Sequence, residues 1–142
     1  MDPLTAISLA SAIIQFIDFS SKLVGGAREI YASAAGATEE NQSLDVVTSE
    51  MRQLASRLVP LKNDGQTEDE RALSRLATEC KIVSDQLEGL LGKLRSSEPK
   101  SKARSVWISL KSKLYEREKM ELQKRLENCR SQLELQLSFL SR

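Results

Sequence analysis

The feature that most constrains the fold is an uncharged stretch near the N-terminus, because no charged residue occurs from Leu4 to Ile17. Asp2 is a good N-cap and Pro3 suits the first helical position, so a helix is predicted to begin here. Its polar residues recur every three or four positions and form one narrow stripe: Thr5, Ser8, Ser11, Gln15 and Asp18. A helix that is apolar on nearly every other side needs several neighbours, so we expect it at the centre of a helical domain.

The helical pattern of this first segment continues beyond the uncharged stretch. It runs through Val24, Ile30 and Tyr31 towards Gly36. The glycine pair at residues 25–26 interrupts it, and glycine pairs are common sites of helix kinks. We therefore expect a weak point or kink at this pair.

Three further apolar seams recur at spacings of three and four, which is typical of amphipathic helices. The first follows a helix start at residues 38–40 and is ended by Pro60 and residues 63–65: Leu44, Val47, Met51, Leu54, Leu58 and Leu61. The second follows a capping box of Thr67 with Glu70: Leu73, Leu76, Cys80, Val83, Leu87, Leu90 and Leu94. The third closes the chain: Leu122, Leu126, Cys129, Leu133, Leu137 and Leu140.

Another helix is indicated between the last two seams by Val106, Trp107, Leu110 and Leu114. The apolar phase slips after Leu114, so we expect a kink or short break near residues 113–116, with one continuous helix as the alternative. Only 6 Gly, 3 Pro and 4% aromatic residues occur in 142 positions, a composition that favours helices over a sandwich or barrel. The predicted fold is all-α: a single domain over residues 1–142, built as an antiparallel bundle of four to five helices.

Charge is unevenly distributed along the chain, although the formal net charge is only +1. Residues 1–92 carry 8 basic and 14 acidic side chains, whereas residues 93–130 carry 12 basic and 5 acidic ones. A basic segment of this kind can contact an anionic surface. No nucleic-acid fold motif accompanies it, so we expect no nucleic-acid partner.

The residue types that most often support catalysis are scarce. The chain has no histidine, the commonest general base and metal ligand. Two cysteines without histidine cannot make a standard zinc site, so neither a metal nor another cofactor is expected, and we predict no catalytic residue. Both cysteines, Cys80 and Cys129, lie on apolar seams and are expected to be buried, reduced thiols of a cytosolic protein. A disulfide is the alternative if the two seams face each other.

Two long stretches resemble one family. Residues 1–36 (MDPLTAISLASAIIQFIDFSSKLVGGAREIYASAAG) and 105–137 (SVWISLKSKLYEREKMELQKRLENCRSQLELQL) are similar to the beginning and end of the fungal N-terminal domain of STAND proteins, which are NOD-like receptors. The most specific residues are Phe16, Asp18, Phe19, Lys22, Ile30, Tyr31, Trp107, Leu122, Arg125, Leu126 and Arg130. The resemblance implies a HeLo-like helical bundle, the effector domain of a longer receptor.

The resemblance also implies a function in signalling and programmed cell death, as in innate immunity and heterokaryon incompatibility. The domain would oligomerise by self-association when its receptor assembles, and then act at an anionic membrane through its N-terminal helix. The alternative is a protein–protein interaction module that recruits a helical partner without touching lipid. The expected location is the cytoplasm, with movement to a membrane on activation.

Two sets of residues are candidates for membrane contact. The insertion candidates are Leu4, Ile7, Leu9, Ile13, Ile14, Phe16, Ile17, Asp18 and Phe19. The anionic-lipid candidates are Lys93, Arg95, Lys100, Lys102, Arg104, Lys111 and Lys113. The plain alternatives are a core helix for the first set and a solvated loop surface for the second. For the first set both interpretations can hold, because a helix can be core at rest and membrane-inserted when activated.

Overall fold

Every element in the described part of the chain is an α-helix. A computed structural model describes residues 3–25, 40–61, 67–97 and 116–140, with side chains for 5–25, 46–61, 67–93 and 116–138. Within these residues the helices are α1 (Pro3–Val24), α3 (Glu40–Ser56), α4 (Glu68–Ser97) and α6 (Glu116–Leu140). The predicted all-α fold is therefore confirmed for the described ranges, while the helix expected over residues 106–114 lies outside them.

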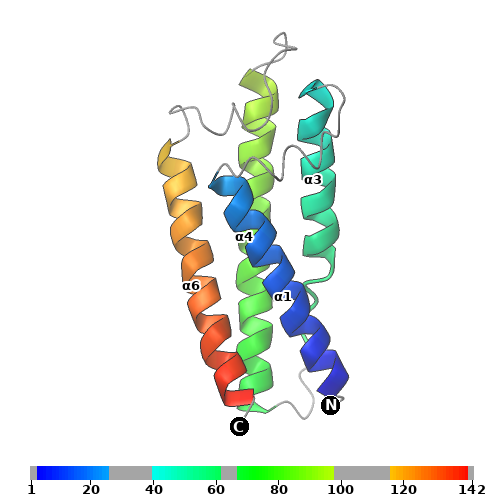
Figure 1. Ribbon diagram of the computed structural model, residues 1–142, viewed down its shortest axis with the longest axis vertical. Helices are drawn as coiled ribbons and strands as arrows, with labels where there is room; N and C mark the ends of the chain where they lie inside the picture. The colour runs from blue at the N-terminus through cyan, green and yellow to red at the C-terminus, as the bar shows by residue number, and fades with distance from the viewer. Residues whose placement is uncertain (1–2, 26–39, 62–66, 98–115, 141–142) are drawn as a thin grey trace.

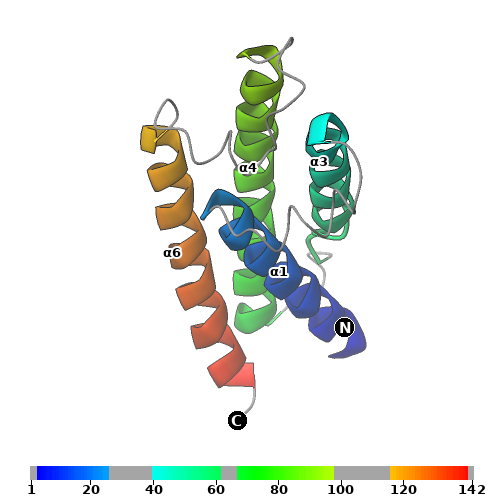
Figure 2. The ribbon, with the colours of Figure 1, turned by 45° about the horizontal axis from the view of Figure 1, so that its top comes forward.

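Two of the four described helices, α1 and α4, connect the bundle through their contacts. Both α1 and α4 contact each other and also contact α3 and α6. Figure 1 shows α1 crossing α4 at an angle, with α6 on one side and α3 on the other, and Figure 2 keeps this arrangement after rotation. The start of α1 and the end of α6 lie at the same end of the bundle.

One hydrophobic core joins all four helices. The large core side chains of α1 are Leu9, Ile13, Phe16, Ile17, Phe19, Leu23 and Val24. The other elements contribute Val47, Met51, Leu58, Leu61, Leu73, Leu76, Cys80, Val83, Leu87, Leu90, Leu91, Leu122, Leu126, Cys129 and Leu133. Leu54 and Leu137 are half-buried against this core. The three seams are thus confirmed, except that the side chains of Leu44, Leu94 and Leu140 lie outside the described set.

Helix α3 ends earlier than its apolar seam predicts. The last helical residue is Ser56, although Leu58 and Leu61 beyond it are buried. Backbone amides of Arg57 and Leu58 donate to carbonyls three residues back, at 3.2 and 3.0 Å, which tightens the last turn. Pro60 lacks a donor and disfavours helical geometry at the preceding residue, so the seam continues after the helix has stopped.

The predicted capping box at the start of α4 is confirmed. The Glu70 amide donates to Thr67 Oγ1 at 3.2 Å, and the Thr67 amide donates to Glu70 Oε1 at 2.8 Å. This backbone hydrogen bond holds the pKa of Glu70 below its ordinary value of 4.5. The pair satisfies two amides that the first turn of a helix leaves open.

Helix α1 reaches the predicted weak point and ends there. Its last helical residue is Val24, and the Gly25 amide still donates to the Ser21 carbonyl at 2.9 Å. The expected continuation towards Gly36 lies outside the described residues. A Cβ at Gly25 would approach that same Ser21 oxygen at 3.0 Å, so a larger residue is strained here.

Candidate functional site

The candidate site is helix α1, which has one buried face and one exposed face. The predicted polar stripe lies on the exposed face, where Thr5, Ser8, Gln15 and Asp18 are open to solvent and Ser11 is half-buried. The side chain of Leu4 lies outside the described set. The helix is therefore not enclosed on all sides, which corrects the expectation of a fully central helix. Among the described helices, α3, α4 and α6 contact α1, and they pack on its apolar face while most of the polar stripe faces solvent.

Two insertion candidates lie on the exposed face rather than in the core. Ile7 is 63% exposed and Ile14 is 45% exposed. They are seven residues apart, so they lie on the same side of the helix, beside the polar stripe. The remaining described apolar candidates, Leu9, Ile13, Phe16, Ile17 and Phe19, are buried. A surface isoleucine contributes little to the core. Moving these two side chains from water into an apolar environment outside the bundle is therefore favourable in free energy.

Polar contacts between α1 and its neighbours include two hydrogen bonds at the rim of the bundle. Arg57 Nη1 donates to Gln15 Oε1 at 2.7 Å, next to the end of α3. Arg130 Nη2 of α6 lies 3.5 Å from Ser21 Oγ. Both are exposed and can be replaced by water. Apolar packing therefore supplies most of the free energy that holds α1 in place.

The charged end of α1 carries an ion pair. Lys22 Nζ lies 3.4 Å from Asp18 Oδ2, one helical turn away, and both side chains are about half exposed. Exposed pairs of this spacing contribute roughly 0.3–0.5 kcal/mol. Asp18 therefore has a weak structural role, which leaves it free to be tested for a membrane role.

Helix α1 is long enough and apolar enough to cross a membrane, by length and composition. The uncharged stretch alone is too short, but the 20-residue window Thr5–Val24 has the length and apolar composition of a spanning helix. Half of this 20-residue window is buried in the bundle, and the core helix of a soluble protein can have the same length and composition. At ~1.5 Å per residue the window is about 30 Å long, which equals the thickness of a hydrocarbon core.

A groove runs beside the first half of α1. It has a volume of about 740 Å³ and separates the helix from the chain that follows α3. Its lining residues are Thr5, Ser8, Leu9, Ala12, Arg57, Val59, Pro60 and Leu61. Since Arg57 bonds Gln15 across this region, the groove sits where α1 is tied to its neighbour.

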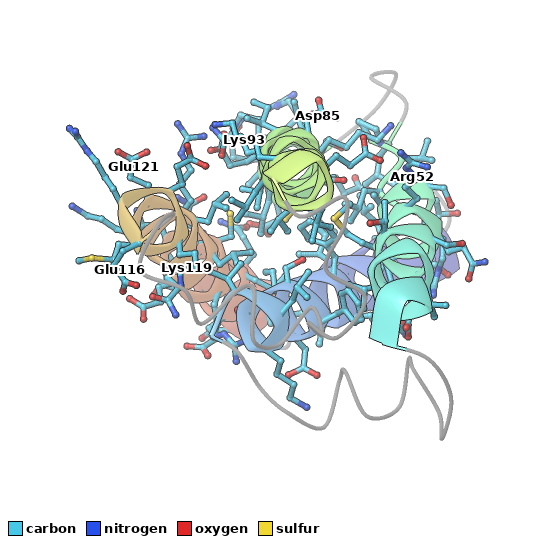
Figure 3. All side chains as sticks on the ribbon, turned by 90° about the horizontal axis from the view of Figure 1, so that it is seen from above. Arg52, Asp85, Lys93, Glu116, Lys119 and Glu121 are labelled. Carbon is cyan, nitrogen blue, oxygen red and sulfur yellow. The ribbon has the colours of Figure 1, made fainter. Side chains whose placement is uncertain are left out.

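Only one of the seven basic candidates has a described side chain. Lys93 lies at the edge of α4 towards α6 (Figure 3), and its Nζ is 2.7 Å from Glu118 Oε1. This ion pair compensates part of its charge. The side chain of Arg95 and the residues Lys100, Lys102, Arg104, Lys111 and Lys113 lie outside the described set.

Cys80 and Cys129 are both buried, as predicted, and they are free thiols. Their seams face each other across α4 and α6, and the two thiols hydrogen bond. That bond and burial raise the pKa of Cys80, whereas the same bond lowers the pKa of Cys129 against the opposing effect of burial. Among the described residues, no group of three His, Cys, Asp or Glu side chains could hold a metal ion.

Sequence reasoning missed three features of the site. The contact between Arg57 and Gln15 joins residues that are far apart in the chain, so no local pattern predicts it. Lys119 is buried, with Nζ 3.4 Å from Glu116 Oε2, although charged residues are seldom buried. The exposure of Ile7 and Ile14 did have a signal, because both lie on the flank of the polar stripe when the helix is drawn in projection.

Comparison with known proteins gives no match: no family model, no curated protein and no solved structure is similar to this chain. The resemblance of residues 1–36 and 105–137 to a receptor domain therefore stays a prediction. The function is inferred from the chain's own residues and from their arrangement.

Proposed function

We propose that this chain is the signalling and cell-death effector domain of a fungal NOD-like receptor, built as an antiparallel HeLo-like bundle. On activation it self-associates and inserts α1 into a membrane. One observation carries the membrane step. Helix α1 offers a 20-residue apolar window of membrane-spanning length, and its exposed face carries Ile7 and Ile14.

The energetics explain why the released helix needs a membrane. Seven large side chains of α1 are buried, and each contributes roughly 1.5–3 kcal/mol to stability. Their sum, on the order of 10–20 kcal/mol, matches or exceeds the whole stability of a typical domain. Release into water would therefore unfold the domain, whereas hydrocarbon replaces the lost apolar surroundings.

The charges of α1 lie in the second half of the Thr5–Val24 window. From Thr5 to Ile17 the helix carries none, and Asp18 and Lys22 lie in its last third as an ion pair. A long lysine side chain near a helix end reaches back to the interface. Asp18 is costly within a membrane unless it faces a polar path. In an assembly of several copies, the stripe of Thr5, Ser8, Ser11, Gln15 and Asp18 lines such a path.

The competing function is an interaction module that recruits a helical partner. The groove beside α1 supports it, since exposed Val59 and Pro60 offer an apolar surface there. Vesicles separate the two functions. We expect the domain to sediment with vesicles of phosphatidylcholine and phosphatidylserine, and to release a trapped dye from them. An intact, folded domain that neither binds nor permeabilises them would contradict the membrane function and favour recruitment.

The basic segment supplies the expected attraction to anionic lipid. Each cation near the surface contributes about 1 kcal/mol. Reversing Lys100, Lys102 and Arg104 to Glu is predicted to abolish sedimentation with anionic vesicles while helicity by circular dichroism stays unchanged. Equal sedimentation of variant and wild type would return these residues to ordinary solvated surface.

Expression in a fungal host tests the cell-death function itself. We expect residues 1–142 to reduce viability and to collect at a membrane. If the domain binds the membrane but does not reduce viability, the result would support the insertion step and contradict the cell-death function.

A further inference from the structure

We propose that Cys80 and Cys129 are a thiol-oxidation site, where a reversible disulfide joins α4 to α6. This proposal goes beyond the membrane function and does not depend on it. It rests on where the two helices place the thiols and on what fixes the helices relative to each other.

The two thiols lie opposite each other at an interface between long helices. Cys80 is 0% exposed on α4 and Cys129 is 1% exposed on α6. A side-chain hydrogen bond links Cys80 and Cys129, and the ion pair between Glu79 and Arg125 beside them places α4 and α6 against each other at this level. Both residues lie in the interior of their helices, and the backbone holds each thiol in place. A disulfide forms only between neighbouring cysteines, so a pair of thiols on facing helices is the arrangement that the bond requires.

Ion pairs on the rim of the same interface show the register of the two helices. Arg125 Nη1 on α6 lies 3.6 Å from Glu79 Oε1 on α4. Glu79 directly precedes Cys80, and Arg125 lies one turn before Cys129, so this pair aligns the helices at the level of the thiols. Lys93 and Glu118 make a second link further along the same two helices, at 2.7 Å.

Oxidation is the chemistry that suits this pair best. A structural zinc site needs four ligands, and among the described residues no group of three metal-binding side chains exists. In cytosolic proteins the disulfides that do form are usually transient and redox-sensing. The hydrogen bond with Cys80 lowers the pKa of Cys129, and a lowered thiol pKa favours the thiolate that reacts with an oxidant.

The reaction needs a two-electron oxidant, and hydrogen peroxide accepts the two electrons that the thiols lose. The Cys129 thiolate attacks one oxygen of hydrogen peroxide, the O–O bond breaks, and a sulfenic acid and water form once the leaving hydroxide gains a proton. Cys80 then attacks the sulfenic sulfur, the S–O bond breaks, and the departing hydroxyl leaves as water with the Cys80 proton. Two thiols and one peroxide thus give one disulfide and two waters, and a dithiol reductant reverses the step.

Burial makes the reaction depend on opening of the bundle. An oxidant reaches thiols of 0–1% exposure only when α4 and α6 separate locally. Oxidation therefore proceeds slowly in the closed domain and faster in mild denaturant. Once formed, the disulfide closes a loop of about 50 residues and raises the melting temperature by roughly 10 °C.

The experiment treats the reduced protein with hydrogen peroxide, traps free thiols with N-ethylmaleimide and measures the intact mass. We expect monomer that has lost two hydrogens, carries no maleimide, melts about 10 °C higher and returns to the starting state with dithiothreitol. Cys80→Ala and Cys129→Ala are the controls, because each keeps one thiol and its melting temperature is not raised by peroxide.

Three results would overturn the proposal: two maleimide-reactive thiols that persist after peroxide in mild denaturant, cross-links only between chains, or an internal disulfide that lowers the melting temperature. Because the mass of the wild-type chain decides the first two, the test stands even if an alanine variant fails to fold.

Discussion

Replacing Ile14 with Glu is expected to block membrane insertion of α1 without changing the stability of the folded domain. Ile14 is 45% exposed in the bundle and lies near the middle of the Thr5–Val24 window. In the folded domain the new carboxylate stays in water, whereas in an inserted helix it reaches the centre of the bilayer. The matched control is Ile82→Glu on α4, because Ile82 is 42% exposed and the change in charge is the same.

The two environments give very different magnitudes. A surface substitution changes the free energy of unfolding by no more than about 0.5 kcal/mol. A charged side chain at the centre of a spanning helix costs about 2.5–3.5 kcal/mol on the insertion scale. At 1.4 kcal/mol per factor of ten, this lowers the inserted population of each copy by roughly 100-fold. The buried neighbour Ile13 cannot serve here, because a charge at a core position unfolds the bundle as well.

The assay combines urea unfolding with dye release from phosphatidylserine-containing vesicles. We expect both variants to unfold within 0.5 kcal/mol of wild type. Ile14→Glu should lose dye release, and Ile82→Glu should keep it. Equal release by both variants would refute insertion of α1, and equal loss by both would assign the effect to net charge rather than to depth.

Three further predictions concern packing, the α1 ion pair and the cap of α4. Leu87→Ala is predicted to lower the free energy of unfolding by about 2–5 kcal/mol in urea, since Leu87 is 1% exposed; a loss under 1 kcal/mol would contradict its place in the core. Asp18→Asn should leave the melting temperature nearly unchanged, because its bond to Lys22 is exposed, and should alter only vesicle leakage; a large drop in melting temperature would assign Asp18 a structural role. Glu70 has a lowered pKa in the folded chain, so its stabilising effect is present above pH 4.5 and disappears as the pH falls through that lowered pKa. Glu70→Gln, which removes the titrating carboxylate, should flatten this acid dependence of the melting temperature, and an unchanged profile would show that Glu70 has no part in it.

The sequence predicts which residues of this fold are buried better than it predicts where the helices end. The seam through Leu73, Val83 and Leu87 is buried because a helix returns to the same face every three or four residues. The same spacing extends the apolar seam of α3 to Leu61, whereas the helix itself ends at Ser56. Apolar spacing reports burial, while the end of the helix was set by the backbone restrictions of Pro60.

The site was predictable in kind but not in its contacts. The uncharged run identified α1 and its polar stripe, but the exposure of most of that stripe to solvent corrects the expectation of a fully central helix. Which apolar residues would flank that stripe in solvent depended on how α3 and α6 pack, as Ile7 and Ile14 illustrate. The sequence likewise could not predict whether Cys80 and Cys129 face each other, since this depends on the relative register of two helices rather than on either seam alone.

The most direct test of the central claim is the depth of α1 in a membrane. An Ile14→Cys variant can be spin-labelled selectively, because position 14 is exposed while Cys80 and Cys129 are buried. Oxygen and a water-soluble nickel complex then compete as relaxation agents, with and without phosphatidylserine-containing vesicles. If α1 inserts, the label becomes accessible to oxygen and shielded from nickel, at a depth of about 15 Å, half the hydrocarbon thickness. A label that stays as accessible to nickel on vesicles as it is in solution would contradict the membrane function of α1.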